Sequence, residues 1–144
     1  LSIIHLVNIQ KDIMYKAPQV NELILATVDD RKDAIYFSDK NSEWILSYIR
    51  AYSKKRIFSD WAFVFNEKAI LDWYKRQLMG QKIRKNINNQ NGLCLMKKLN
   101  ISRYIYDKTN SKHDYTLMFK KFRYIFQNKR YVIFEIKNNK IKCD

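Results

Sequence analysis

Glycine and proline are almost absent from this 144-residue chain, which contains 2 Gly and 1 Pro. Such low usage disfavours the Gly-rich loops that cradle phosphates in nucleotide-binding enzymes, and it disfavours linker or collagen-like segments. No apolar run approaches the roughly 18 residues of a membrane-spanning helix, so we expect no membrane partner. The apolar residues 3–9 are interrupted by His5 and Asn8 and lack a basic flank, so they match a signal peptide poorly.

Cysteine and histidine are equally scarce, with two of each. Cys94 and Cys143 form no C-x-x-C pair, so they support neither a disulfide framework nor a zinc site, and we expect a reducing compartment. His5 and His113 have no Cys, Asp or Glu partner at the spacing of metal ligands. The chain also lacks a P-loop, a G-x-S-x-G and an H-E-x-x-H motif. The sequence therefore predicts no metal site and no cofactor.

Positive charge is what the chain has in excess. It contains 28 Lys and Arg against 14 Asp and Glu, which gives a formal net charge of +14. Residues 1–50 are close to neutral, so residues 51–144 carry essentially all of the excess. A domain with so much unbalanced charge repels itself unless a polyanion compensates it, and nucleic acid is the commonest such partner. Codon bias toward lysine does not explain the asymmetry, because it would act on residues 1–50 as well.

Most cations after residue 50 occur in short clusters. Lysine outnumbers arginine, which suits contacts with phosphates better than bidentate reading of bases. Tyrosines lie among the clusters at Tyr104, Tyr106, Tyr124 and Tyr131, where we expect them to stack on unpaired bases. We predict that nucleic acid is bound by Lys54, Lys55, Arg56, Lys82, Arg84, Lys85, Lys97, Lys98, Arg103, Lys120, Lys121, Arg123, Lys129 and Arg130.

The pattern of apolar residues predicts one compact α+β domain over residues 1–144, with two or more helices in the first half and antiparallel β-hairpins in the second. Ser42 is placed to cap a helix, and Asn66 is placed to cap another that runs to residue 79 and ends at Gly80. Residues 35–37 fit a short strand. The tryptophans are expected to anchor the core; they are Trp44, Trp61 and Trp73.

Two hairpins are expected in the second half. The Asn-Gly pair within residues 88–92 predicts a turn between strands over residues 81–87 and 93–99. Residues 119–137 alternate in a way that predicts a second hairpin, with its turn at residues 127–129. A helix is the alternative for the first run alone, because Met118, Phe122 and Ile125 also fit a helical stripe. We expect one face of this hairpin to be apolar and the other to be basic and dotted with aromatic residues.

One short motif points to a different function. Glu135-Ile136-Lys137 with Asp114 upstream resembles the D…(D/E)xK pattern of metal-dependent nucleases. That resemblance implies that Asp114 and Glu135 hold Mg²⁺ while Lys137 orients the attacking water. An ion pair across neighbouring strands explains the same residues. We therefore expect a protein that is not an enzyme, and we keep a small nuclease and a viral or plasmid DNA-binding protein as alternatives.

Composition adds an indication of origin. Lys, Asn, Ile, Tyr and Phe, all with AT-rich codons, make up about half of the chain, which starts at Leu1 without Met. In these respects the chain resembles ribosomal proteins encoded by AT-rich mitochondrial genomes, although no motif assigns a family. The resemblance implies a non-catalytic rRNA-binding protein of a large ribonucleoprotein in the mitochondrial matrix, or alternatively in the cytoplasm. Residues 51–144 would then contact rRNA, and residues 1–50 would contact neighbouring proteins.

Overall fold

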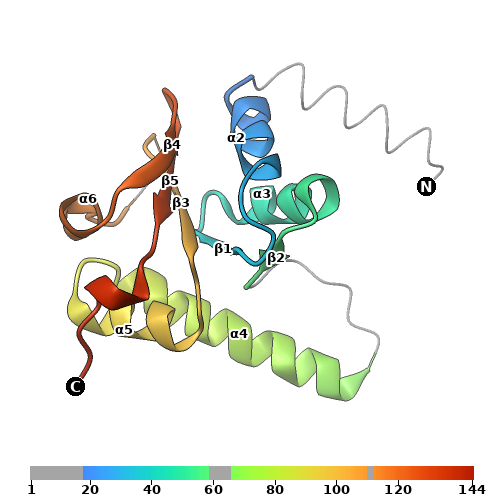
Figure 1. Ribbon diagram of the computed structural model, residues 1–144. Coiled ribbons are helices and arrows are strands. Elements are labelled where there is room, and N and C mark those ends of the chain that lie inside the picture. Colours follow the sequence, from blue (N-terminus) through green and yellow to red (C-terminus); the bar gives the residue numbers. More distant parts are fainter. Residues whose placement is uncertain (1–17, 59–65, 110–111) are drawn as a thin grey trace.

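The computed structural model of the protein describes residues 18–58, 66–109 and 112–144 (Figure 1). These residues form helices and a five-stranded sheet in one α+β domain, as predicted. In chain order the elements are α2 (Pro18–Val28), β1 (Ile35–Ser38), α3 (Glu43–Tyr48), the π-helical turn η1 (Ile49–Ser53), β2 (Arg56–Ile57), α4 (Glu67–Lys85), α5 (Gln90–Lys98), β3 (Arg103–Asp107), α6 (Thr116–Lys121), β4 (Tyr124–Gln127), β5 (Tyr131–Glu135) and the 3₁₀ turn η2 (Asn138–Lys140).

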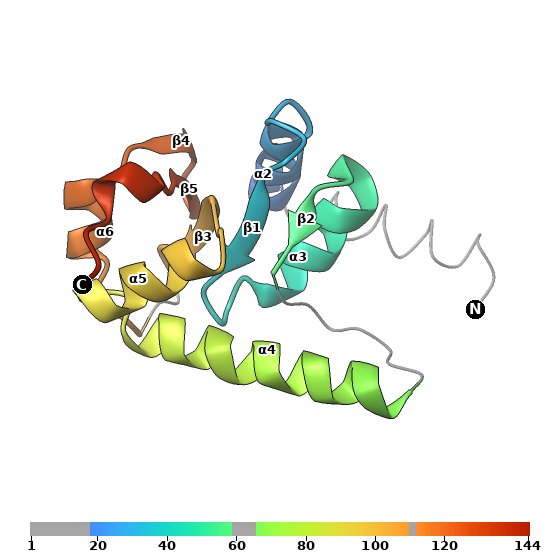
Figure 2. The same ribbon diagram turned by 60° about the horizontal axis from the view of Figure 1, so that its bottom comes forward.

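The sheet has the strand order β2-β1-β3-β5-β4. β1 pairs in parallel with β2 and β3, whereas β5 pairs antiparallel with β3 and β4. Parallel neighbours need crossover connections, which α3, α4 and α5 supply. The chain moves from β1 to β2 on one side and then crosses to β3 on the other. Figures 1 and 2 show α4 and α5 along one side of the sheet and α2 on the other.

The two central strands, β3 and β5, carry much of the core. Tyr104, Ile105, Val132 and Phe134 are fully buried, as is Tyr131. Strands covered on both faces are apolar throughout rather than alternating. The predicted basic face is therefore wrong for β5, and Tyr104 and Tyr131 are too deeply buried to stack on bases.

The hairpin itself is confirmed in residues 124–135. β4 pairs with β5, and the Asn128 side-chain oxygen accepts hydrogen bonds from the backbone N–H groups of Arg130 (2.9 Å) and Tyr131 (2.8 Å). This local bonding holds the turn between the strands. Residues 119–121, expected in the first strand, belong to α6 instead.

The other predicted hairpin, over residues 81–99, is wrong because these residues form the end of α4 and the whole of α5. Asn89 caps α5 by accepting a hydrogen bond from the Gly92 N–H at 3.2 Å. A Cβ atom on Gly92 would lie 2.0 Å from the Asn86 carbonyl oxygen. A Cβ atom on Gly80 would lie 2.9 Å from the Phe37 ring. The two glycines therefore allow close packing, and neither forms a β-turn or ends a helix.

The helix caps and core tryptophans predicted for the first half of the chain are confirmed only in part. Asn66 caps α4 through the Ala69 N–H at 2.9 Å, but the Ser42 hydroxyl makes no cap bond at the start of α3. Trp44 is 38% exposed and Trp73 is half-buried, so neither is a core anchor. Trp61 lies outside the described residues. No helix in the described ranges has the length and apolar content that a bilayer span requires.

Cys94 and Cys143 form a disulfide, contrary to the prediction. They lie 49 positions apart, so their spacing gave no signal. The fold brings them together because the segment after β5 returns to α5. There, the Lys97 ammonium donates to the carbonyl oxygen of Ile141 at 2.9 Å, and the Ile141 side chain is buried.

We predict that Cys94→Ser lowers the free energy of unfolding by about 2–4 kcal/mol, since the disulfide constrains a long loop of the unfolded chain. Urea titration of the oxidised protein and the variant measures the difference. A dithiol reductant should destabilise the parent protein by a similar amount and leave the variant unchanged. Equal urea midpoints for parent and variant would contradict the prediction.

Candidate nucleic-acid interface

A cleft of about 660 Å³ opens at the end of the sheet where the strands β1 and β3 begin and β5 ends. Ile35, Ser102 and Ile136 contribute to its walls, together with the segments that follow α5 and β5. This volume lies within the range of small-molecule and cofactor sites. The cleft is therefore large enough to enclose part of a ligand.

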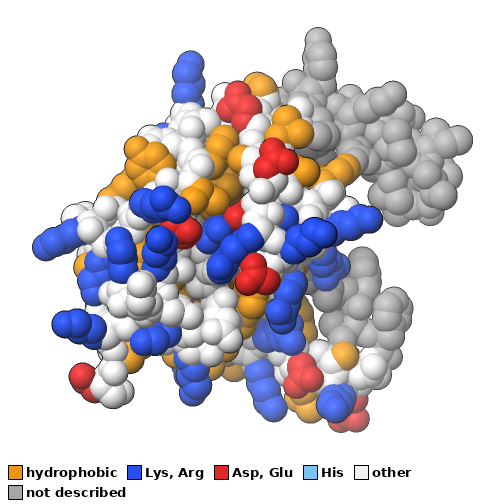
Figure 3. All heavy atoms as spheres, viewed as in Figure 1, with side chains coloured by type: hydrophobic (Ala, Val, Ile, Leu, Met, Phe, Trp, Pro, Cys, Tyr) orange, Lys and Arg blue, Asp and Glu red, His pale blue; other side chains and the backbone are white. Residues whose placement is uncertain are grey.

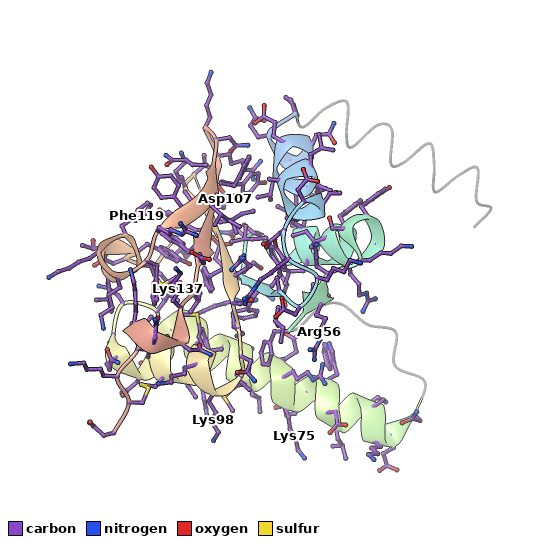
Figure 4. The ribbon with its side chains drawn as sticks, in the orientation of Figure 1. Arg56, Lys75, Lys98, Asp107, Phe119 and Lys137 are labelled. Carbon is purple, nitrogen blue, oxygen red and sulfur yellow. A yellow bond between two sulfur atoms is a disulfide. The ribbon has the colours of Figure 1, made fainter. Side chains whose placement is uncertain are left out.

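Cations line the cleft from separate elements. Arg31 precedes β1, Arg56 begins β2 and Lys137 follows β5, and all three side chains are exposed. Figure 4 labels Arg56 on β2 and Lys137 just after β5, and both residues line the same cleft. Arg56 has no acidic partner among the described residues, whereas Arg31 lies 3.4 Å from Asp33. The cleft thus favours an anionic ligand.

Amide side chains add uncharged hydrogen-bonding groups to the same walls. Asn100, Asn138 and Asn139 line the cleft, and their side chains make no hydrogen bond to other described residues. Asn100 has a positive φ of 54° in the left-handed turn that ends α5, where the Ile101 N–H donates to the Met96 carbonyl at 3.0 Å. An amide offers both donors and acceptors, so these groups are available to a ligand.

A buried ion pair supports the cleft from within. Both side chains of the pair, Asp30 and Arg103, are buried, and the guanidinium donates twice to the carboxylate, at 2.7 and 2.8 Å. The Tyr36 hydroxyl also donates to Asp30, at 2.5 Å. Burial by itself raises the pKa of Asp30, but the hydrogen bonds from Arg103, Tyr36 and the Arg31 backbone outweigh it, so the pKa lies below its ordinary value.

A polar network fills the opposite end of the sheet, at the carboxyl ends of β1 and β3. Open α/β sheets commonly bind ligands beyond the carboxyl ends of their strands, at the point where the strand order reverses. Here that point lies between β1 and β3, where the Asp39 carboxylate accepts from the backbone N–H groups of Ser42 (2.8 Å) and Asp107 (2.7 Å). Arg130 pairs with the buried Asp107 at 3.0 Å. Burial raises the pKa of Asp39 despite these bonds.

The predicted contact residues divide by exposure. Three of them, Lys55, Arg84 and Arg103, are buried. Lys55 donates to the Asp30 carbonyl, and Arg84 lies 3.7 Å from Glu43 and donates to the Ser38 carbonyl at 2.9 Å. These three are less accessible to nucleic acid than the exposed cations, because their charges stabilise the interior; Arg103 nevertheless lines the cleft.

Another group is bonded near the surface. Lys97 donates to the Ile141 carbonyl, and Lys121 donates to the Gln90 side chain at 2.8 Å. Arg130 pairs with Asp107, and Arg123 with Glu135. The remaining members are exposed and have no acidic partner among the described residues. They are Lys54, Arg56, Lys82, Lys85, Lys98, Lys120 and Lys129.

The exposed cations are spread widely. Figure 3 shows Lys and Arg side chains over the hairpin side and the helical side of one face, with several acidic side chains among them. Sequence reasoning missed Arg31 and the three asparagines of the cleft. Arg31 lies in the near-neutral part of the chain, and asparagine carries no charge, so counting cations gave no signal for either.

The residues of the nuclease hypothesis are not assembled into a metal site. Asp114 accepts from Thr116 and from Asn88 in the turn between α4 and α5, at 2.6 Å for each side chain. Glu135 instead pairs with Arg123 and lies 3.8 Å from Lys137, so the two carboxylates share no partner. No cluster of three or more His, Cys, Asp or Glu residues suited to a metal ion occurs in the described parts of the chain.

Comparison with known proteins gives no family for this chain. No protein-family model matches it, and a search of curated proteins finds no match either. The functional argument therefore rests on the residues and their geometry.

We predict that Asp30→Asn lowers the free energy of unfolding at pH 7 by about 3–5 kcal/mol, because Arg103 would stay buried without its counter-charge. Since folding lowers the pKa of Asp30, the stabilisation is present above the ordinary pKa of 3.8 and is lost as pH falls below it. The difference between parent and variant in urea titrations should shrink accordingly. The double variant Asp30→Leu/Arg103→Met should be much less destabilised. A single variant as stable as the parent at pH 7 would contradict this assignment.

Proposed function

We propose that the protein is a non-catalytic RNA-binding component of a large ribonucleoprotein, and that its exposed cations neutralise RNA phosphates. The supporting observation is the set of exposed lysines and arginines that have no acidic partner in the described chain, in a protein with a net charge of +14. Such cations release counterions from a nucleic acid when they replace them. The buried pairs of Arg84 with Glu43 and of Arg103 with Asp30 neutralise two of the positive charges, and the excess on the surface remains.

The cleft is the part of this surface where cations and amide groups lie together. Arg31, Arg56 and Lys137 lie beside amide groups that are able to bond to sugars and bases as well as to phosphates. Lysine and arginine spread over a broad face suit a ligand that is long and uniformly anionic. RNA in a ribonucleoprotein has this chemistry, and so does DNA.

The first part of the described chain suits contacts with protein. Leu25 and Val28 on α2 are exposed, as are Trp44 on α3 and Tyr52 on η1. Exposed apolar groups are common at protein interfaces, and α4 presents Ile70, Leu71 and Tyr74 in the same way. We therefore propose that this part of the fold faces neighbouring proteins of the assembly.

Composition and the disulfide favour different compartments. The AT-rich residue usage favours a ribosome of the mitochondrial matrix, the location we propose for the assembly. Disulfides, however, persist mainly in oxidising compartments, and Cys94 is paired with Cys143. Thiol labelling of the protein taken directly from cells tests this point, since a matrix protein with reduced cysteines would incorporate label at both positions.

Lysine footprinting tests the proposed function. We predict that bound rRNA slows acetylation of Lys98, Lys120 and Lys129 by at least a few fold, because their ammonium groups would contact phosphates. Lys40 lies 2.6 Å from Glu43 in the near-neutral part and should react equally with and without RNA. Mass spectrometry of the modified peptides gives the rates. Unchanged rates at all exposed lysines, at an RNA concentration where other basic proteins are protected, would contradict the proposal.

A further inference from the structure

A second hollow adjoins the cleft. It has a volume of about 360 Å³ and is lined by apolar groups that include Phe58 and Met79. The two hollows share Ile35, Arg56 and Leu99, so they are neighbouring compartments of one groove. The exposed Lys75 and Arg76 of α4 border the second compartment, and Figure 4 labels Lys75 on that helix.

The compartments differ in chemistry. The first presents the asparagine amides of Asn100, Asn138 and Asn139 with cations at its rim, and the second presents an aromatic ring and thioether and aliphatic groups with cations at its rim. An unpaired nucleotide offers matching parts, since it has an apolar base face, base edges and a 2′-hydroxyl that hydrogen-bond, and an anionic phosphate. A duplex hides its base faces and its pairing edges, so it has fewer groups that fit this groove.

We infer that the groove binds an unpaired stretch of RNA, with Arg56 on a phosphate between two successive nucleotides. This inference rests on the proposed function and adds the form of RNA and the place where it binds. Arg56 lines both compartments, so a strand that fills both would pass its phosphate beside this residue. Lys75 and Lys137 then lie on either side, where the neighbouring phosphates pass.

The base of one nucleotide packs against Phe58, Met79 and Leu99 in the apolar compartment. Phe58 is half-buried, and its ring meets the Phe37 ring edge to face with centroids 5.3 Å apart, so the core holds it in position. Stacking on such a surface is tolerant of base identity. In the polar compartment, the amides of Asn138 and Asn139 bond to the edge of the next base or to its 2′-hydroxyl.

The acidic residues of the cleft offer hydrogen-bond acceptors to a nucleotide. Asp33 is exposed at the cleft and Glu135 is partly exposed there. A carboxylate accepts hydrogen bonds from base amino groups and from a 2′-hydroxyl, whereas it repels phosphates and the carboxylates of an acidic peptide alike. The cations, amides and carboxylates together suit a ligand that combines phosphates with N–H and O–H donors.

The test compares four single variants of the full chain in binding to a labelled ten-nucleotide single strand and to an RNA duplex of the same sequence. Arg56→Gln and Asn138→Ala alter the groove. Their matched controls are Lys129→Gln and Asn91→Ala, which alter exposed residues on the hairpin turn and on the outer side of α5. All four side chains are exposed, so circular dichroism should report unchanged folding. Fluorescence anisotropy at about 150 mM salt gives the affinities.

We expect the parent protein to bind the single strand about tenfold tighter than the duplex, because stacked bases add affinity that a duplex cannot supply. Arg56→Gln should weaken single-strand binding several-fold more than Lys129→Gln, and Asn138→Ala more than Asn91→Ala. The preference for the single strand should fall in the groove variants and persist in the controls.

Three outcomes would overturn the inference, and failure of the proposed function is distinguishable from failure of the groove. If the parent protein binds RNA but groove variants and controls lose the same affinity, RNA binding stands and the groove is not its site. The same holds if a polyglutamate peptide displaces the single strand as well as unlabelled RNA does. If the parent protein binds neither single-stranded nor duplex RNA at about 50 mM salt, the proposed function fails as well.

Discussion

Asp30 is the residue on which the arrangement of the sheet edge depends. Its carboxylate accepts from Arg103 at the start of β3 and from Tyr36 on β1, and its carbonyl accepts from Lys55 just before β2. One short turn after α2 therefore holds the starts of all three parallel strands together. Because the cleft opens at these same strand starts, the buried ion pair determines where Arg56 and Arg31 lie.

The positively charged residues fall into two groups, one buried and paired with carboxylates and one exposed. Arg84 and Arg103 compensate buried carboxylates, which is necessary because an unpaired charge in the interior is strongly destabilising. Exposed lysines such as Lys98, Lys120 and Lys129 compensate no carboxylate within the described chain and remain available to a polyanion. The sequence presents both groups as the same kind of basic cluster. The two kinds are told apart by burial, which depends on contacts between residues far apart in the chain.

Local signals predicted local structure well and failed where tertiary contacts decide. The cap at Asn66, the strand at residues 35–37 and the hairpin turn at Asn128 depend on nearby residues, and they were predictable. The Asn-Gly pair predicts a turn at Gly92. In the structure, the absence of a side chain at Gly92 instead allows α5 to lie close to the Asn86 carbonyl.

The disulfide and the cleft show the same limit. Cys94 and Cys143 meet because the segment after β5 returns across α5, and nothing near either cysteine indicates this. The cleft combines Arg31, Arg56, Asn100 and Lys137, which are brought together by the strand order. The charge asymmetry predicts an anionic partner, and the fold adds a groove in which we propose that it binds.

The central claim is that the surface cations bind RNA through its phosphates, and the dependence of RNA affinity on salt tests it most directly. If about five phosphates of a single strand are neutralised, affinity should fall roughly a hundredfold between about 50 and 200 mM salt, linearly on logarithmic axes. An affinity that does not change over this range, or no binding at the lower salt concentration, would contradict the account.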